Sequence, residues 1–222
     1  AGPITRANVL LPQEREQRPG KPGMAYRGLW LIMLGLVKKG LIADYIADYN
    51  NWIFDDPTAY FGFEDAMGVL GFTLQIYFDF SGYCDVATGV GLMFNIKIPL
   101  NFNSPYKSLS IREFWQRWHI TLSRFLTNYI YFPLGGSRRG MARTCVNLMI
   151  VFLASGLWHG AGWLFLLWGL MHGAASVLYR LFRRQYDALH PALQWLLTFI
   201  FVVIAWVFFR ATSMADALAI VK

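Results

Sequence analysis

The chain has 222 residues, of which 56% are hydrophobic and 15% charged, and its formal net charge is +7. A soluble domain carries about 25% charged residues, so the composition excludes an ordinary soluble protein and points to lipid as the solvent. The basic residues lie in short segments between apolar runs, as the positive-inside rule produces, and we therefore expect no nucleic-acid partner. Cys84 and Cys145 fit no disulfide or metal-ligand spacing, so we predict that they are free packing residues.

Residues 1–25 are rich in proline, glycine and charges of both signs, which predicts an interfacial or cytoplasmic segment. The chain begins without a methionine, and its first residues show no signal-peptide pattern. We interpret residues 1–222 as a single helical domain that is incomplete at both ends, an internal fragment of a longer protein.

Two apolar runs follow this segment. Gly28–Ile46 is interrupted by two lysines, so it is an imperfect span whose lysines snorkel or whose helix tilts along the interface. An acidic stretch over residues 44–65 is predicted to be rich in turns. The second run, Ala66–Phe94, is a long span, and its repeated glycines allow close helix packing in lipid.

The following segments suggest a helix that does not cross the membrane. Residues 95–110 read as a basic loop on the cytoplasmic side, opposite the acidic stretch. Over residues 111–134 apolar side chains recur at helical spacing, which predicts an amphipathic helix. The next loop, 135–143, is basic again. Because both ends of the helix then face the cytoplasm, we expect it to be interfacial or re-entrant.

A helical hairpin is predicted next. Thr144–Trp158 forms a helix of roughly 22 Å, shorter than the roughly 30 Å of the hydrocarbon core. The turn that starts at His159 is therefore expected at membrane depth, before Trp163–Tyr179 returns. A last apolar run, Leu193–Phe209, starts back across.

His159 is the sharpest candidate for chemistry. A titratable imidazole at a glycine-flanked helix break is costly in lipid unless it has a function. Gly160 and Gly162 remove side chains beside it, which makes room for a ligand. The alternative is a histidine that bonds to a neighbouring helix and ties the bundle together.

The other histidines are weaker candidates on their own. His119, at the border of the amphipathic helix, reads as an interfacial residue unless that helix brings it towards the His159 turn. His172 does not share a helical face with His159 and is expected to pack or to support other residues. His190 precedes a proline in a loop and is expected to be solvated.

Two carboxylates, Asp79 and Asp85, lie inside the second span. Intramembrane carboxylates suggest function, but pairing with an arginine such as Arg112 or Arg117 explains them equally well. The sequence contains no nucleophile elbow, glycine-rich phosphate loop or metal-ligand cluster. If the protein is an enzyme, base catalysis by histidine is therefore the available chemistry, and no metal is expected.

Six short motifs together resemble a known family. They are 2–4 (GPI), 78–83 (FDFSGY), 101–106 (NFNSPY), 114–123 (FWQRWHITLS), 131–136 (YFPLGG) and 155–160 (SGLWHG). In this order they are similar to the membrane-bound O-acyltransferase (MBOAT) family, and within it to the bacterial branch with the alginate O-acetyltransferase membrane subunit. The resemblance implies an all-α polytopic fold, a ring of transmembrane and re-entrant helices around a funnel. It carries the catalytic histidine onto His159 and a second active-site histidine onto His119.

The same resemblance implies a function in a bacterial cytoplasmic (inner) membrane. A multi-pass O-acyltransferase would move an acetyl group across the membrane for O-acetylation of an exopolysaccharide such as alginate. Its co-substrate would be acetyl-CoA or a carrier-bound acyl thioester, with no permanently bound cofactor. The expected partners are the lipid bilayer and periplasmic proteins of a polysaccharide acetylation complex.

Three alternatives stay open at this point. One is transfer of D-alanyl or another acyl group to a cell-wall glycan. A second is a proton-coupled transporter with Asp79, Asp85 and His159 as its proton relay. The third is a subunit that only scaffolds an acetylation complex, in which both histidines would tolerate substitution.

Overall fold

The computed structural model describes residues 2–16 and 22–221, and within these ranges the regular structure is entirely helical, which confirms the all-α class. The α-helices are α1 (Ala7–Arg15), α2 (Pro22–Leu36), α3 (Asp44–Asp55), α4 (Phe63–Met93), α5 (Ile111–Arg117), α6 (Ile120–Leu126), α7 (Gly140–His159), α8 (Trp163–Leu181), α9 (Arg183–Asp187), α10 (Pro191–Arg210) and α11 (Met214–Val221). Two π-helical segments, η1 (Val37–Ala43) and η3 (Thr127–Tyr131), and a 3-10 turn, η2 (Pro105–Lys107), connect some of them.

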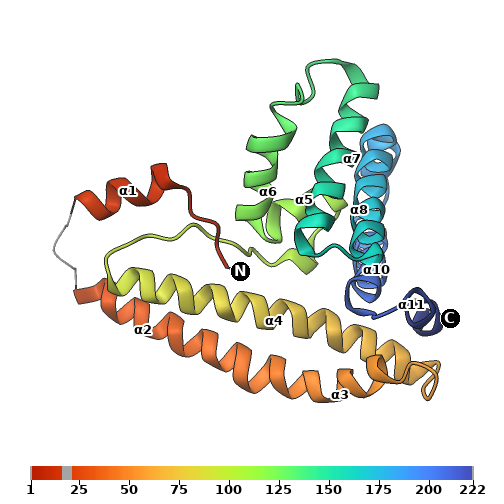
Figure 1. Ribbon diagram of the computed structural model, residues 1–222, viewed down its shortest axis with the longest axis horizontal. Coiled ribbons are helices and arrows are strands. Elements are labelled where there is room, and N and C mark those ends of the chain that lie inside the picture. Colours follow the sequence, from red (N-terminus) through yellow and green to blue (C-terminus); the bar gives the residue numbers. More distant parts are fainter. Residues whose placement is uncertain (1, 17–21, 222) are drawn as a thin grey trace.

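The helices form two groups (Figure 1). Helices α2 and α4 run side by side as a long antiparallel hairpin, and η1 continues α2 into α3. Helices α5 to α8 and α10 stand on one side of this hairpin, steeply inclined to it. The N-terminal segment enters the space between the two groups, whereas the C-terminus lies beside the hairpin at α11.

Glycines set the close approach of α2 and α4. A Cβ atom on Gly28 would lie 2.6 Å from the carbonyl oxygen of Gly89, and one on Gly89 would lie 2.5 Å from that of Gly28. Two turns further along, Gly35 and Gly82 meet in the same reciprocal way, at 2.5 and 2.7 Å. These small residues therefore allow backbone contact, as the sequence predicts for packing in lipid.

The charged residues of this hairpin pair with one another. Lys38 Nζ lies 2.6 Å from Asp85 Oδ2, and Lys39 Nζ lies 2.6 Å from both Asp79 Oδ1 and Asp44 Oδ1. The carboxylates of α4 and the lysines of η1 are thus paired, and each neutralises the other's charge.

The predicted arginine partners of these carboxylates are wrong. Arg117 instead pairs with Glu113, one turn earlier on the same helix, at 2.8 Å. The lysines reach the carboxylates because they lie on the helix that packs directly along α4, whereas Arg117 is on α5.

The acidic stretch 44–65 also differs from its prediction. Most of it is helix α3, and the irregular turn is confined to residues 56–62. Helix α3 buries Asn50, Ile53 and Phe54 against the rest of the protein, while its acidic residues lie on the exposed face. The acidic residues thus mark the solvent-facing side of an amphipathic helix rather than a loop.

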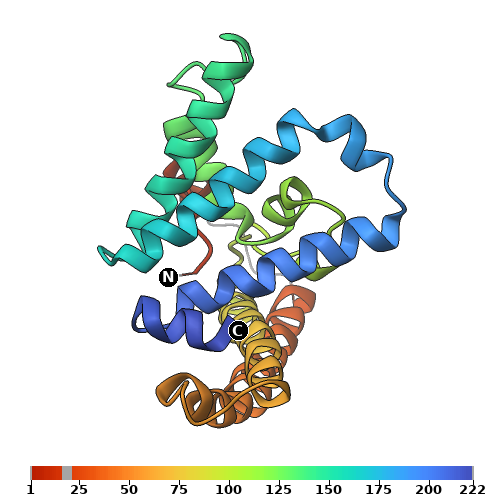
Figure 2. The same cartoon turned by 90° about the vertical axis from the view of Figure 1, so that its right-hand side faces the viewer.

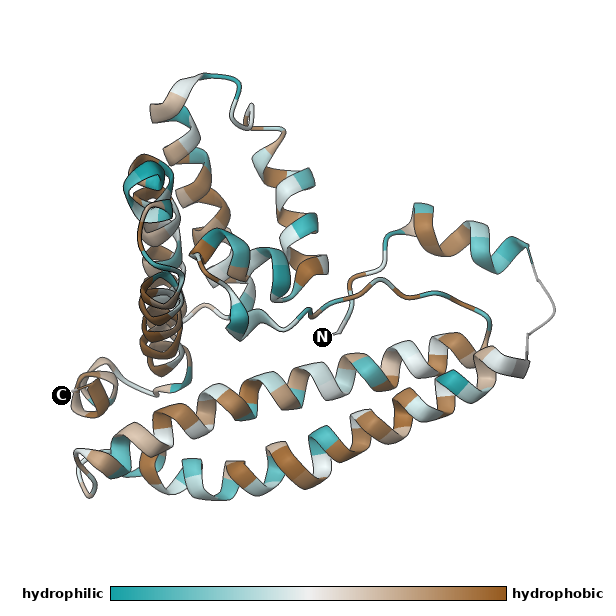
Figure 3. Ribbon diagram, turned by 180° about the vertical axis from the view of Figure 1, so that it is seen from behind, coloured by the Kyte–Doolittle hydropathy of each residue, from teal (hydrophilic) through white to brown (hydrophobic). Residues whose placement is uncertain are grey.

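Three helices of the described residues, α7, α8 and α10, are long and apolar enough to cross a membrane. Figure 3 shows hydrophobic colours along them and hydrophilic colours near α9, where α8 connects to α10. Helix α7 has 20 residues because it begins at Gly140 rather than at Thr144. Its length is then about 30 Å, the full thickness of a hydrocarbon core, so helix length does not place the His159 turn at mid-membrane depth.

Helices α7 and α8 diverge from the turn at residues 160–162 (Figure 2). Their closest approach lies just before that turn, where Gly156 faces Gly169. A Cβ atom on Gly169 would lie 2.5 Å from the Phe152 carbonyl oxygen, and one on Gly156 would overlap the Phe165 carbonyl oxygen. The end of α7 is therefore fixed against α8 by backbone contact.

Candidate active site

A cavity of about 750 Å³ lies where the two helix groups meet, lined by residues of α4 to α8 and α10 and by the end of α2 with η1. Indole rings form much of its wall: Trp115, Trp118, Trp158, Trp168 and Trp206. His119 and His159 both line it. The protein therefore brings together the two histidines that the sequence singles out.

His119 reaches the cavity because the predicted helix over 111–134 is broken. Helix α5 ends at Arg117 and α6 begins at Ile120, so the continuous amphipathic helix is wrong at this point. The backbone of His119 is left-handed, with φ 41° and ψ 53°. This region is unfavourable for a residue with a side chain, and such strain persists only where the surroundings impose it.

The surroundings that impose the break come from residues 101–103. The Ile120 N–H donates to the Asn101 carbonyl oxygen at 3.0 Å, and the Asn103 N–H donates to the Arg117 carbonyl oxygen at 2.9 Å. In a continuous helix the Ile120 N–H and the Arg117 C=O would each bond along the helix. Here they bond to the segment 101–103 instead.

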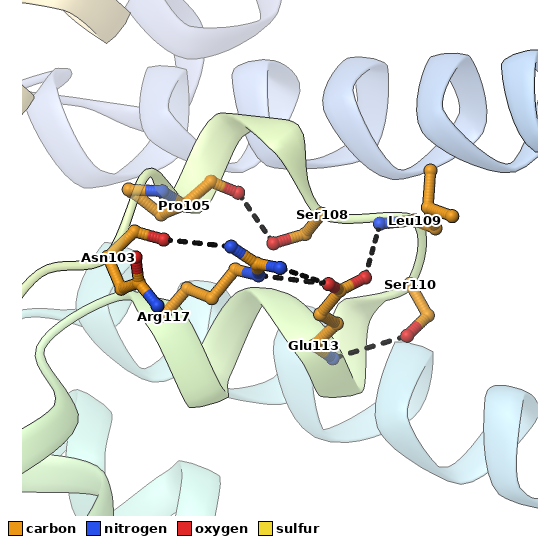
Figure 4. Close-up of polar contacts among 7 residues, drawn as sticks. All are labelled: Asn103, Pro105, Ser108, Leu109, Ser110, Glu113 and Arg117. Atoms are coloured by element: carbon orange, nitrogen blue, oxygen red, sulfur yellow. Dashed lines mark hydrogen bonds and ion pairs between the residues drawn. The ribbon is translucent and has the colours of Figure 1, made fainter.

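A second set of hydrogen bonds fixes the start of α5 (Figure 4). Ser110 Oγ accepts from the Glu113 N–H at 3.2 Å, while Glu113 Oε2 accepts from the Leu109 N–H at 2.8 Å. This arrangement is similar to a capping box, except that Glu113 accepts from the residue before the N-cap Ser110 rather than from Ser110 itself. Arg117 then links Glu113 to the Asn103 carbonyl oxygen at 3.1 Å, so the whole of α5 is tied to the segment before it.

The side chain of His119 is buried, with 2% of its surface exposed, and is hydrogen-bonded to Asn101. Its Nδ1 lies 3.1 Å from Asn101 Oδ1. The same oxygen accepts from the Thr121 N–H at 3.1 Å and from Thr121 Oγ1 at 2.8 Å. The ring also packs edge-on against Phe80, with centroids 4.7 Å apart.

His159 is held differently, by aromatic rings. It is the last residue of α7, and its ring lies 4.9 Å from Trp158, 5.2 Å from Trp168 and 5.0 Å from Phe209, measured between centroids. Within the described part of the chain its ring nitrogens make no hydrogen bond, so the alternative of a histidine bonded to a neighbouring helix has no support here.

The glycine after His159 does not leave space for a ligand. A Cβ atom on Gly160 would lie 2.6 Å from Cε2 of Phe165, so that ring fills the space beside the backbone. The expectation of ligand room at this glycine is therefore wrong. Gly160 is not among the residues that line the cavity, whereas His159 is.

One indole ring contacts both histidines. The Trp158 ring centroid lies 4.9 Å from that of His159 and 6.0 Å from that of His119. The other two histidines are not part of this arrangement. His172 is fully buried outside the cavity, where its Nδ1 accepts from Trp115 Nε1 at 3.2 Å, and His190 is exposed and caps α10. His172 thus supports a cavity residue, as the sequence analysis expects.

The charged residues of the cavity wall come from the hairpin. Lys39 and Asp79 line the cavity, whereas Lys38 and Asp85 do not. Two residues of the site were not predicted from the sequence to belong to it, Lys39 and Asn101. Lys39 is detectable as a cation in an apolar run, but the contact of Asn101 with His119 depends on the helix break and has no local signal.

Comparisons with known proteins agree with this architecture. Residues 1–215 match the family model of MBOAT, the membrane-bound O-acyltransferase family. The chain belongs to the MBOAT family. The MBOAT membership predicted from the sequence motifs is thereby confirmed, and with its apolar helices the chain is a membrane protein.

Three relatives show the range of MBOAT proteins that this chain is similar to. It is 46% identical to a peptidoglycan O-acetyltransferase of Helicobacter pylori over 100% of the chain and 43% of that protein. It is 42% identical to a probable alginate O-acetylase of Pseudomonas aeruginosa over 98% of the chain and 42% of that protein. It is 27% identical to a teichoic acid D-alanyltransferase of Bacillus subtilis over 83% of the chain and 49% of that protein. The chain spans less than half the length of each.

Proposed function

We propose that this chain forms the reactive centre of a membrane O-acyltransferase, with His159 as the general base and His119 as the residue that orients the acceptor. The observation that carries the proposal is the placing of both imidazoles in one cavity, in contact with a single indole ring. Two titratable side chains converging in a largely aromatic cavity are typical of a catalytic site.

In the proposed reaction, a neutral His159 accepts the proton of the attacking hydroxyl group as its oxygen bonds to the thioester carbonyl carbon. The carbon–sulfur bond then breaks, and the proton on His159 passes to the leaving thiolate. An ester and a thiol result. The aromatic wall of the cavity offers few polar groups, so the electrostatic effect of the groups that do face the substrate is strengthened. The thioester is acetyl-CoA or a carrier-bound acyl group.

The acyl group that fits best is acetyl. The relatives named as O-acetyl enzymes are 46% and 42% identical to the chain, against 27% for the D-alanyltransferase. The acceptor is proposed to be a polysaccharide, either an exopolysaccharide such as alginate or peptidoglycan. We further propose that the protein lies in the bacterial cytoplasmic membrane as a multi-pass protein and passes acetyl to periplasmic proteins of an acetylation complex.

The domain arrangement remains part of this proposal. Residues 1–222 are proposed to be one MBOAT domain, incomplete at both ends, with 1–25 as an interfacial segment and 111–134 as a re-entrant or interfacial region. The hydrogen bond from the Ile4 N–H to Thr121 Oγ1, at 2.9 Å, supports a fixed position of the first residues against α6.

The test is the complete protein with His159→Ala, compared with His190→Ala as a matched control at an exposed histidine. Acetyl content of the exopolysaccharide and peptidoglycan fractions is measured, with membrane levels of each variant checked in parallel. Removing a general base is expected to lower transfer by about 100- to 10,000-fold, whereas the control keeps it. Normal acetylation of both fractions by His159→Ala would overturn the proposed role of this residue.

The transporter alternative is less well supported. Its proposed relay needs Asp79, Asp85 and His159 in one path, but Asp85 pairs with Lys38 and does not line the cavity. It predicts solute flux that depends on the proton gradient, without an acylated product. Loss of acetylated polysaccharide in His159→Ala with unchanged flux would separate the two.

A further inference from the structure

We propose that Asn101 is a positioning residue that holds His119 as its Nδ1–H tautomer, so that Nε2 offers a lone pair to the hydroxyl group of the acyl acceptor. The tautomer follows from the hydrogen bonds of described residues alone. That the ligand is the hydroxyl group of an acyl acceptor rests on the proposed function. The tautomer of His119 distinguishes two roles for this residue: orienting the acyl acceptor, or stabilising the oxyanion.

The orientation of the Asn101 amide is fixed by its neighbours. The Thr121 N–H can only donate, and it lies 3.1 Å from Asn101 Oδ1. On the other side, Asn101 Nδ2 donates to Cys84 Sγ at 3.2 Å. The atom that faces His119 is therefore the amide oxygen, which carries no hydrogen.

Thr121 contributes its hydroxyl proton to the same oxygen. Thr121 Oγ1 accepts from the Ile4 N–H at 2.9 Å and lies 2.8 Å from Asn101 Oδ1. Because the amide oxygen has no proton to give, the hydroxyl is the donor in that contact. This chain of bonds connects the N-terminal segment with the amide that contacts the histidine.

The proton on His119 follows from these assignments. Its Nδ1 lies 3.1 Å from an oxygen that can only accept, so Nδ1 must carry the hydrogen. In the neutral imidazole Nε2 is then unprotonated. Nε2 has no hydrogen-bond partner among the described residues, and the ring lines the cavity, so this lone pair is available to a ligand.

This tautomer decides what a neutral His119 can do. Stabilising an oxyanion requires a hydrogen-bond donor towards the substrate, which Nε2 then lacks. Accepting a hydrogen bond from a hydroxyl group requires a lone pair, which it has. Asn101 also accepts the Ile120 N–H through its carbonyl oxygen, so one residue holds both the strained backbone and the ring of His119.

The first experiment reads the tautomer directly. Nitrogen-15 NMR of the complete protein with labelled histidine, at neutral pH in lipid, is compared with His119→Gln to assign the His119 signals. We expect a protonated Nδ1 and an unprotonated Nε2. A protonated Nε2 in the neutral ring of the unmodified protein would overturn the proposal, and this readout is independent of any activity.

The second experiment measures acyl transfer against pH for Asn101→Leu, Asn101→Asp and the control Asn103→Asp, whose exposed side chain lies two residues away. Asn101→Leu removes the fixed tautomer and is expected to lower kcat by about 10- to 100-fold, as loss of a residue that orients a functional histidine does.

Asn101→Asp keeps an acceptor oxygen but adds a negative charge, which favours the imidazolium form. Its acid limb should therefore move to higher pH while activity at alkaline pH is largely restored, a pattern that a purely structural role would not produce. If Asn101→Leu folds and keeps full kcat, or if Asn101→Asp leaves the pH profile unmoved, the positioning role is wrong. An unmodified protein that transfers no acyl group but shows the expected tautomer would instead overturn the proposed function.

Discussion

Two helix pairs, α2–α4 and α7–α8, are built on the same contact and serve the molecule differently. In both, glycines let one backbone touch the other, at Gly28–Gly89 and Gly35–Gly82 in the first pair and at Gly156–Gly169 in the second. Beside the α2–α4 pair, η1, which continues α2, adds ion pairs with α4. The α7–α8 pair has none at its crossing, and instead ends in a histidine surrounded by aromatic rings.

The two helix pairs therefore differ in what their glycine contacts determine: the α2–α4 contacts contribute to stability, whereas the α7–α8 contacts also set the position of His159. The packing of α2 on α4 is stabilised by two glycine contacts and, through η1, by ion pairs, so no single contact determines it. In the α7–α8 pair, the contact between backbones at Gly156 lies less than one turn before His159. The same added methyl group should therefore cost both pairs stability but should displace the candidate base only in α7–α8.

The largest effect is expected for Gly156→Ala. The added Cβ overlaps the Phe165 carbonyl oxygen, a backbone atom that cannot rotate away, so α8 must shift from α7. A displacement of about 1 Å in a catalytic group can cost about 100-fold in rate, and we expect a 10- to 100-fold loss of acyl transfer. Activity is measured per folded molecule, with folding followed by tryptophan fluorescence in detergent. Full activity per folded molecule would mean that the crossing does not set the position of His159.

Gly28→Ala is the matched change in the other pair. Its Cβ would lie 2.6 Å from the Gly89 carbonyl oxygen, so overpacking should lower the free energy of unfolding by about 1–3 kcal/mol. Neither glycine lines the cavity. Activity per folded molecule should therefore stay at the unmodified level, and a loss as large as that of Gly156→Ala would remove the distinction between the two pairs.

The sequence predicted the apolar helices of this architecture better than its irregular points. Apolar runs predicted α7, α8 and α10 to within a few residues, because a long apolar segment has few alternatives in lipid. Helix α7 begins earlier than predicted because its first turn is basic and was assigned to the loop. Helix α3 was missed because its acidic residues suggested turns, although they cover only its exposed side.

The sequence predicted the two histidines of the candidate site, but it did not predict the contacts that hold them in place. Both histidines named from the sequence line the cavity. The break at Trp118 and His119 could not be predicted, because helical spacing of apolar residues continues through it. It is imposed by Asn101, which lies 18 residues earlier in the chain. A contact of this kind is determined by tertiary structure and leaves no periodic signal.

A smaller effect is expected for Lys38→Met, which removes an ion pair from the hairpin without touching the cavity. The side chains of Lys38 and Asp85 are 21% and 25% exposed, and their contact should contribute about 1 kcal/mol to stability. A double-mutant cycle with Asp85→Asn isolates this coupling from the loss of the lysine itself. No coupling would show that glycine contact alone determines how α2 packs on α4. Acyl transfer per folded molecule should not change, since Lys39 and not Lys38 lines the cavity.

The smallest effect, and one of opposite sign, is expected for Gly40→Ala. Gly40 lies in η1, five residues after Gly35, but a Cβ built on it meets no atom within 4 Å. Without a clash, only the conformational preference of the chain changes, because alanine restricts the unfolded state more than glycine does. The free energy of unfolding should therefore rise by about 0.5 kcal/mol in the same fluorescence measurement. If Gly40→Ala destabilises the protein as much as Gly28→Ala, a side chain is harmful even where it meets no atom. The cost at Gly28 could then not be attributed to the contact between backbones.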